Sequence, residues 1–226
     1  MVAVDLLFRG LGKPLTVRAA RRAIVGRNRS RYEPEKGRFT TAEINRILNQ
    51  TWKDFGLLLP NLPREPTLGS RISLKLAALT LTFFRNLTTS GIEARYALEL
   101  VSDVCWRIFQ QWGHVVKRVY RLFGIDIVGL YSQHAQLDGS WTLGFPFNPP
   151  GFLARYTPVE GGVGFNVVRC PIAEFMRSQG ASDLAVGTWC MLDYSFLEMQ
   201  GLRLERSKTL AKGDKECDFR LYPNDQ

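Results

Sequence analysis

Histidine is scarce in this 226-residue chain, which contains only His114 and His134. A site built on several histidine ligands is therefore excluded. Long hydrophobic runs are also missing, because the richest apolar stretch, residues 72–84, is interrupted by a lysine and by hydroxyl side chains. It falls short of the roughly 20 apolar residues that a membrane-spanning helix needs. The first nine residues include an aspartate and no clear cleavage site, so we expect no secretory signal and a cytoplasmic protein.

Cysteine occurs at only four positions, Cys105, Cys170, Cys190 and Cys217. In a reducing compartment such thiols are reactive or buried rather than bridged. The sequence contains no Cys-x-x-Cys pair, so we expect no metal and no other cofactor. A zinc site made by Cys190, Cys217 and a third thiol stays an alternative.

Acidic residues are absent from residues 9–31, which carry eight lysines and arginines, while the whole chain has a net charge of +9. We expect residues 1–38 to form a flexible basic arm that makes weak contact with an anionic surface and is dispensable for catalysis. No nucleic-acid-binding motif follows this arm, so no specific nucleic-acid partner is expected. Residues 39–226 are expected to form one domain.

Hydrophobic residues make up 45% of the chain, and their spacing changes along it. Helical spacing dominates first, with Thr40 and Glu43 placed as a capping box, and alternation characteristic of strands follows. The expected elements are helices over 40–59, 76–89 and 92–122, strands near 141–145 and 163–167, a helix pair, and a hairpin of 202–210 with 216–222. The sequence thus predicts an α+β fold, with N-terminal helices packed on a mostly antiparallel sheet, C-terminal helices and a closing β-hairpin.

Cys170 directly precedes Pro171, which is typical of the first position of a helix. Cys170 would then be the N-cap residue, where free N–H groups and the helix dipole lower the pKa of a thiol. A buried structural thiol at the end of a strand is the alternative. The position alone does not choose between them.

Cys190 and Asp193 lie three residues apart in a segment with helical spacing, so they share one face. The aspartate stands among apolar side chains, including Trp189 and Tyr194, and burying it without a partner would be costly. In the hairpin, Arg206 would point inward if Leu204 and Leu210 face the core, since the three alternate along one strand, and a guanidinium there suits a carboxylate. An outward register, or an ion pair with Asp218 or Glu205, is equally compatible with the pattern.

Residues 167–222 resemble the C-terminal core of the L-2-amino-thiazoline-4-carboxylic acid hydrolase family. Three motifs carry the resemblance. The first is a Cys-Pro before a helix, here Cys170-Pro171, and the second is a Cys-x-x-Asp, here Cys190 with Asp193. The third is a closing Arg-x-x-Thr-Leu-Ala-x-Gly-x-x-x-Cys-Asp-Phe, which runs from Arg206 to Phe219. A looser likeness extends over residues 57–100. Residues 1–38 have no counterpart in the family.

The resemblance implies an enzyme that opens a cyclic amidine of the thiazoline type by breaking a C–N or a C–S bond, with no cofactor. It implies that Cys190 is the nucleophile, Asp193 the general acid and base, and Cys170 a second catalytic thiol. Trp189, Tyr194 and Arg206 would then bind the small-molecule substrate, with Arg206 holding its carboxylate, while Cys217 and Phe219 would line the pocket.

Two weaker local likenesses leave other functions open. The Cys-x-x-Asp segment is similar to one in organomercurial lyases, which would indicate a thiol-dependent lyase. The closing segment is similar to the end of the V4R domain, which would indicate a pocket that binds a hydrophobic ligand without catalysis. The zinc site of that domain is not expected, because Arg206 and Thr209 stand where it has a glutamate and a cysteine. The sequence does not indicate an oligomeric state.

Overall fold

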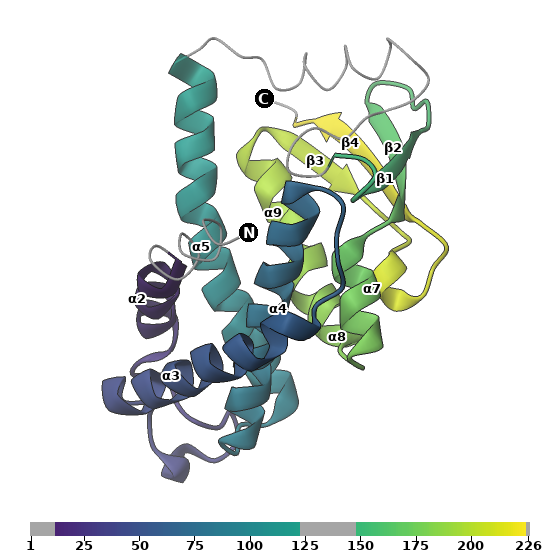
Figure 1. The fold of residues 1–226 in the computed structure, drawn as a ribbon. Helices are drawn as coiled ribbons and strands as arrows, with labels where there is room; N and C mark the ends of the chain where they lie inside the picture. Colours follow the sequence, from purple (N-terminus) through teal and green to yellow (C-terminus); the bar gives the residue numbers. More distant parts are fainter. Residues whose placement is uncertain (1–11, 123–147, 225–226) are drawn as a thin grey trace. The chain divides into compact units, whose positions relative to one another are not determined.

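The computed structural model describes residues 12–122 and 148–224, and within these ranges the chain forms two compact units (Figure 1). Unit 1 consists of residues 12–60 and 78–111, and unit 2 of residues 61–77, 112–122 and 148–224. Helices α4 (Leu68–Thr89) and α5 (Ala94–Leu122) contribute residues to both units. The division differs from the expected boundary at residue 38, because residues 13–38 pack within unit 1.

Helix α2 (Lys13–Ile24) is the part of unit 1 that departs most from expectation. Its Ala19, Ala20, Ala23 and Ile24 are buried, and the helix packs on α3 (Thr41–Leu58). The expectation of a flexible arm is therefore wrong for residues 13–38. Small and apolar side chains at positions i, i+1, i+4 and i+5 give α2 a buried face, while its basic residues occupy the other face.

The remaining helices of unit 1 agree with the sequence pattern. Thr40 caps α3, because its hydroxyl accepts a hydrogen bond from the Glu43 amide, as the capping box predicts. The helix ends at Leu58, two residues before Pro60, and the short 3₁₀ segment η3 (Leu59–Asn61) follows. Helix α4 begins eight residues before the predicted start but ends at the predicted breaker, and α5 covers the predicted span. The core of unit 1 consists of apolar side chains such as Ile44, Leu48, Leu87, Leu100 and Val101.

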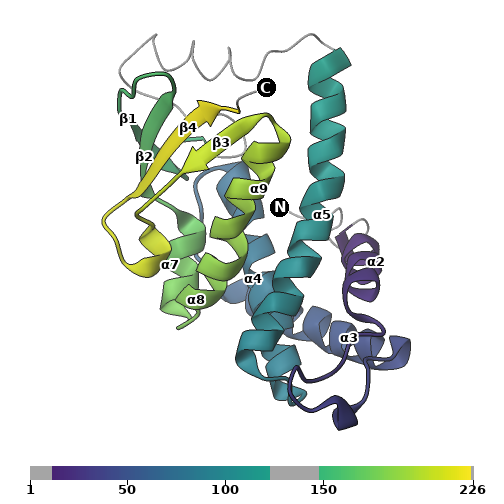
Figure 2. The same cartoon turned by 180° about the vertical axis from the view of Figure 1, so that it is seen from behind.

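Unit 2 contains a four-stranded antiparallel sheet in the order β1-β2-β4-β3 (Figures 1 and 2). The strands are β1 (Leu153–Tyr156), β2 (Val163–Arg169), β3 (Leu202–Glu205) and β4 (Cys217–Pro223). The predicted alternation in β2 is confirmed, since Val163, Phe165 and Val167 are all buried. The strand expected near residues 141–145 lies outside the described residues.

The closing hairpin pairs β3 with β4 as predicted, but its connection is longer. The first strand ends at Glu205 rather than at residue 210, because residues 206–216 leave the sheet and include the 3₁₀ turn η5 (Leu210–Lys212). Gly213 ends that turn in the left-handed region, with φ of 99°, which few other residues adopt readily. This connection carries residues of the candidate site.

Helices α7 (Pro171–Ser178), α8 (Ser182–Ala185) and α9 (Met191–Met199) lie beside the sheet, with the π-helical turn η4 (Val186–Cys190) joining α8 to α9. Helices at the N-terminus followed by an antiparallel sheet with its own helices make this an α+β fold, as predicted. Among the described residues, no helix is both long and apolar enough to cross a membrane.

Candidate active site

Arg206 connects the two residues that the sequence placed on one helix face. Its Nη1 pairs with Asp193 Oδ2 at 2.7 Å, and its Nη2 donates to the Cys190 carbonyl oxygen at 2.6 Å. The rings of Tyr194 and Phe219 each lie 5.0 Å from the guanidinium carbon. Only 5% of the Arg206 side chain is exposed, so the guanidinium is held on its edges by oxygen atoms and by two aromatic rings.

The alternative partners considered for Arg206 are engaged elsewhere. Asp218 accepts hydrogen bonds from the Ser207 amide, the Ser207 hydroxyl and the Lys208 amide, and Glu205 pairs with Arg203. Burial raises the pKa of the Asp218 carboxyl, but these hydrogen bonds outweigh it and lower the pKa overall. Asp218 therefore fixes the start of the connection that carries Arg206.

Cys190 and Cys217 meet at the hydroxyl group of Thr209. Each sulfur lies 3.5 Å from Thr209 Oγ1, and Thr209 is 6% exposed. Cys217 also accepts a hydrogen bond from the Leu210 amide at 3.2 Å, and its thiol donates to Thr209. The Thr209 hydroxyl is then free to donate to Cys190, so the hydrogen-bond chain runs from Leu210 to the Cys190 sulfur.

All three thiols of unit 2 are harder to ionise than an ordinary cysteine. Burial raises the pKa of Cys190 to about 11 and that of Cys170 to about 12, and it also raises the pKa of Cys217. The hydrogen bond from Thr209 opposes this rise at Cys190 and at Cys217. Cys190 and Cys217 also contribute to the raised pKa of Cys170, and Cys217 contributes to that of Cys190.

The predicted lowering of the Cys170 pKa is wrong. Cys170 is the N-cap residue of α7 with Pro171 following, as expected, and the amides of Ala173 and Ile172 do favour its thiolate. Loss of solvent around the half-buried sulfur outweighs these amides. The sequence reveals the helix start but not the burial of the thiol.

Asp193 combines a buried environment with access from outside. Burial raises the pKa of its carboxyl, while the Arg206 ion pair acts in the opposite direction. Its side chain keeps 41% exposure, and the hydrogen bond to Arg206 uses only one carboxylate oxygen. A ligand that approaches from this side can therefore contact the carboxyl group.

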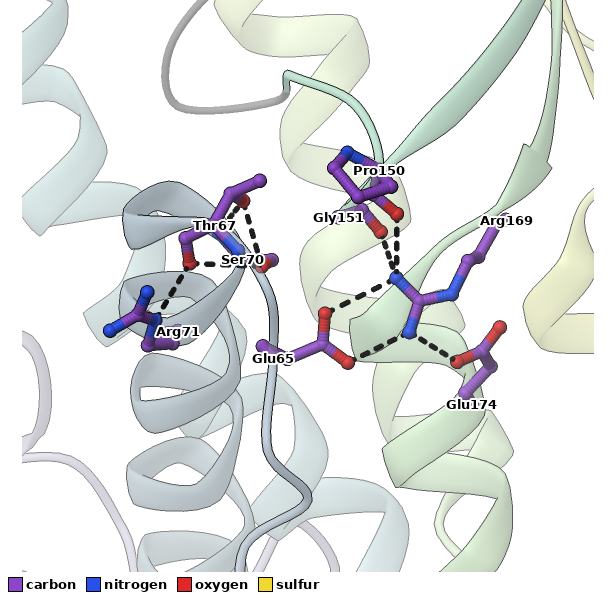
Figure 3. A network of polar contacts seen from close by, with 8 residues as sticks. All are labelled: Glu65, Thr67, Ser70, Arg71, Pro150, Gly151, Arg169 and Glu174. Atoms are coloured by element: carbon purple, nitrogen blue, oxygen red, sulfur yellow. Dashed lines mark hydrogen bonds and ion pairs between the residues drawn. The ribbon is translucent and has the colours of Figure 1, made fainter.

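An ion pair supports the β2–α7 junction beside Cys170 (Figure 3). Arg169 binds Glu65 through two parallel contacts, Nη2–Oε1 at 2.8 Å and Nη1–Oε2 at 3.2 Å. Its Nη1 also donates to the carbonyl oxygens of Pro150 and Gly151, and its Nη2 contacts Glu174 at 3.3 Å. The Glu65 side chain is 4% exposed, so this pair is nearly desolvated on the carboxylate side.

The loop at Gly151 approaches the start of α4 closely. Thr67 and Ser70 hydrogen bond to each other there, with their hydroxyl oxygens 2.8 Å apart (Figure 3). A Cβ atom on residue 151 would lie 2.5 Å from Thr67 Oγ1 and 2.6 Å from the Ser70 Cβ. Only glycine fits here without displacing this hydrogen-bonded pair.

The structure brings most of the predicted site residues of unit 2 into direct contact with one another. Cys190, Asp193, Tyr194 and Phe219 surround the guanidinium of Arg206, and Cys217 joins Cys190 through Thr209. Trp189 is half-buried in η4, next to Cys190 in the chain. Cys105 belongs to unit 1, where its thiol lies 3.9 Å from the Thr80 hydroxyl.

Metal-ligand geometry is not found among the described residues, where no three His, Cys, Asp or Glu side chains form a group that could hold an ion.

In unit 2, Thr209 and Glu65 are the residues that sequence reasoning missed. Thr209 stands in the motif shared with the hydrolase family but has no chemical signature of its own. Glu65 precedes its partner by 104 residues, and nothing local in the sequence indicates that pairing.

Comparison with known proteins gives one finding. No curated protein and no solved structure is significantly similar to the chain. A family model matches residues 149–221, about a third of the chain, and this range contains Cys170, Cys190, Asp193 and Arg206. The looser likeness over residues 57–100 lies outside it. The resemblance stated from the sequence is thus confirmed over residues 149–221, which match the L-2-amino-thiazoline-4-carboxylic acid hydrolase family.

Proposed function

We propose that unit 2 is a hydrolase that opens a cyclic amidine of the thiazoline type by breaking a ring C–N or C–S bond. The observation that carries the proposal is that Arg206 binds both the Asp193 carboxylate and the backbone carbonyl of Cys190 within the segment that matches the hydrolase family. A thiol, a carboxyl group and a guanidinium are the three groups that such a reaction on a carboxylate-bearing ring needs.

Cys190 is the proposed nucleophile. Its sulfur adds to the ring carbon of the C=N bond, the π electrons move to nitrogen, and the thiol proton passes to a nearby base. The Thr209 hydroxyl supports the thiolate by donating to it, which partly offsets the raised pKa of the buried thiol. Collapse of the adduct then expels the ring nitrogen or sulfur, and water releases the opened product from Cys190.

Asp193 is the proposed general acid and base. In its ionised form it accepts the thiol proton, and once protonated it donates that proton to the departing ring atom. Its raised pKa and its exposed oxygen suit both steps. Cys170 is proposed as a second thiol of this centre, because it lies in the matched segment and Cys190 contributes to its raised pKa.

Arg206 is the proposed anchor for the substrate carboxylate. Two N–H groups of its guanidinium bind Asp193 and Cys190, and a guanidinium has five. A substrate carboxylate would therefore join an ion pair that is already formed and would lie next to the catalytic carboxyl group. The aromatic side chains of Tyr194 and Trp189 are proposed to contact the ring of the substrate.

The test compares two serine variants. The purified chain is incubated with cyclic amidines and small thio-heterocycles, and products are followed by mass spectrometry. Cys190→Ser should lose turnover by orders of magnitude with little change in melting temperature, because a serine hydroxyl is scarcely ionised at pH 7. Cys105→Ser, which removes a thiol from unit 1, should retain turnover. Full activity per folded molecule in Cys190→Ser would refute the nucleophile.

A second candidate function rests on the raised pKa values of the three thiols. Thiols that stay protonated at neutral pH are also compatible with a pocket that binds a ligand without catalysis. In that case the wild-type chain would bind a heterocycle without converting it, and Cys190→Ser would weaken binding only as far as it lowers stability.

A further inference from the structure

Unit 1 contains a basic pocket that has no role in the proposed hydrolase reaction. It has a volume of about 480 Å³, and its lining includes Arg27, Asn28, Ser30, Arg31, Arg38 and Tyr96. Three arginines thus belong to the lining of one surface hollow. The hollow is wide and largely open to solvent, so a ligand would bind at the surface.

The loop that forms this pocket, residues 26–39, is held in place by several hydrogen bonds. Gly26 and Phe39 pair through their backbones at 2.9 Å, and Asn28 forms an antiparallel bridge with Arg38. The Tyr96 hydroxyl donates to the Asn28 carbonyl oxygen at 2.8 Å. Phe39 is 2% exposed and anchors the end of the loop in the core. A ligand would therefore meet guanidinium groups on a preformed loop, which reduces the entropy cost of binding.

Ion pairs orient two of the arginines without filling the pocket. Arg27 pairs with Asp103 at 2.5 Å and Arg31 pairs with Glu99, in each case through one terminal nitrogen. Neither acidic residue lines the pocket. Both guanidinium groups therefore keep other N–H donors for a ligand.

Arg38 supplies positive charge that is not neutralised by a partner. In the described ranges, its exposed side chain has no acidic side chain or other hydrogen-bond partner. Arginine is the preferred side chain for phosphate, because its planar donors match the phosphate oxygens in pairs. The pocket combines this open guanidinium with the Ser30 side chain and with the two oriented arginines.

We propose that this pocket binds a phosphate ester, with Arg38 as its principal ligand. The ester can belong to a soluble phosphorylated molecule or to the headgroup of an anionic lipid, and the chemistry of recognition is the same for both. The site lies in unit 1, so it is independent of the hydrolase reaction proposed for unit 2.

The experiment uses the full chain and three probes: inorganic phosphate, glycerol 3-phosphate, and phosphatidylcholine vesicles that contain phosphatidic acid. Calorimetry measures the binding of the soluble probes, and co-sedimentation measures that of the vesicles. Arg38→Gln removes the open guanidinium, whereas Arg46→Gln removes the same charge from an exposed position on α3. Arg38→Lys keeps the charge and loses the paired donors.

Arg38→Gln should weaken binding about tenfold, the loss expected for one charge-assisted contact of about 1.4 kcal/mol, and Arg46→Gln should weaken it less than about twofold. The loss of binding in Arg38→Lys should lie between the losses in these two variants. Binding of glycerol 3-phosphate would identify a soluble ester, and binding of the vesicles alone, still dependent on Arg38, would identify a headgroup. Equal losses in the Arg38→Gln and Arg46→Gln variants, or no binding to any probe, would overturn the proposal.

Discussion

Arg206 illustrates what a single residue contributes to the candidate site. The alternation of Leu202, Leu204 and Arg206 is compatible with an inward or an outward side chain, and the structure shows the side chain of Arg206 almost fully buried. Its partner Asp193 is thirteen residues earlier, on a helix, and no local pattern indicates the pairing. The sequence indicated the chemistry of Arg206 but left its direction open, because the strand ends at Glu205, and the identity of the partner required the fold.

The buried thiols make stability depend on pH in the alkaline range. Cys170 has a folded-state pKa of about 12, whereas an unfolded cysteine ionises near about 8.5. Between these values the folded state keeps a proton that the unfolded state releases. Its contribution to stability is therefore complete below about pH 8.5 and is lost as the pH rises towards the folded pKa.

We predict that Cys170→Ala will have a flatter alkaline stability profile than the wild-type chain. Each buried thiol adds a slope of at most about 1.4 kcal/mol per pH unit, and the variant lacks one of them. Urea unfolding at pH 8, 9, 10 and 11 measures the difference, and every group other than Cys170 is common to both chains. Parallel profiles would show that the Cys170 thiol ionises as easily in the folded state as in the unfolded state.

At the scale of elements, the β2–α7 junction depends on a charge brought from elsewhere in unit 2. Strand β2 ends at Arg169 and helix α7 begins at Pro171, so Cys170 lies between two elements. Arg169 is bound by Glu65 and by the carbonyl groups of the loop before β1. These contacts of Arg169 therefore fix the backbone on one side of the Cys170 thiol.

We predict that Glu65→Gln will lower the free energy of unfolding by about 1.5–3 kcal/mol, the usual range for a hydrogen-bonded charged partner. Glu174 contacts the same guanidinium but is 51% exposed, so Glu174→Gln should cost less than about 1 kcal/mol. Chemical denaturation of both variants gives the comparison. Similar losses in the two variants would mean that burial of Glu65 adds nothing to the ion pair.

The helices and the hairpin pairing were predictable because their signals are local. Capping at Thr40, apolar spacing and alternation in β2 each depend on neighbours in the chain. The end of β3 was misjudged, because the alternation continues past Glu205 while the backbone leaves the sheet. Hydrogen bonds from residues 207 and 208 to Asp218 decide that departure, and such contacts leave no periodic pattern in the sequence.

At the scale of the whole molecule, the basic N-terminal segment was misread because charge was given more weight than burial. Eight basic residues with no acidic residue suggest repulsion and flexibility, yet alanines and Ile24 lie between them on one face. Arg27, Arg29 and Arg31 pair with acidic residues from other helices of unit 1. The segment therefore contributes to the packing of unit 1.

We predict that Ile24→Ala will destabilise the chain by about 2–5 kcal/mol, because Ile24 is completely buried. The neighbouring Val25 is 37% exposed, so Val25→Ala should change stability by no more than about 0.5 kcal/mol. Thermal and urea unfolding monitored by circular dichroism measure both. If the two variants unfold alike, the buried face of α2 would contribute nothing to the stability of the chain.

The Glu65–Arg169 pair also bears on the portability of unit 2. The segment that matches the hydrolase family, residues 149–221, contains the arginine of this pair but not the glutamate, which comes from 104 residues earlier. A fragment cut at the limits of the match would keep the candidate catalytic residues and would leave the Arg169 cation without its buried counter-ion. We therefore expect the matched segment to be less stable on its own than within unit 2, and a transplanted segment to gain stability from a carboxylate that replaces Glu65.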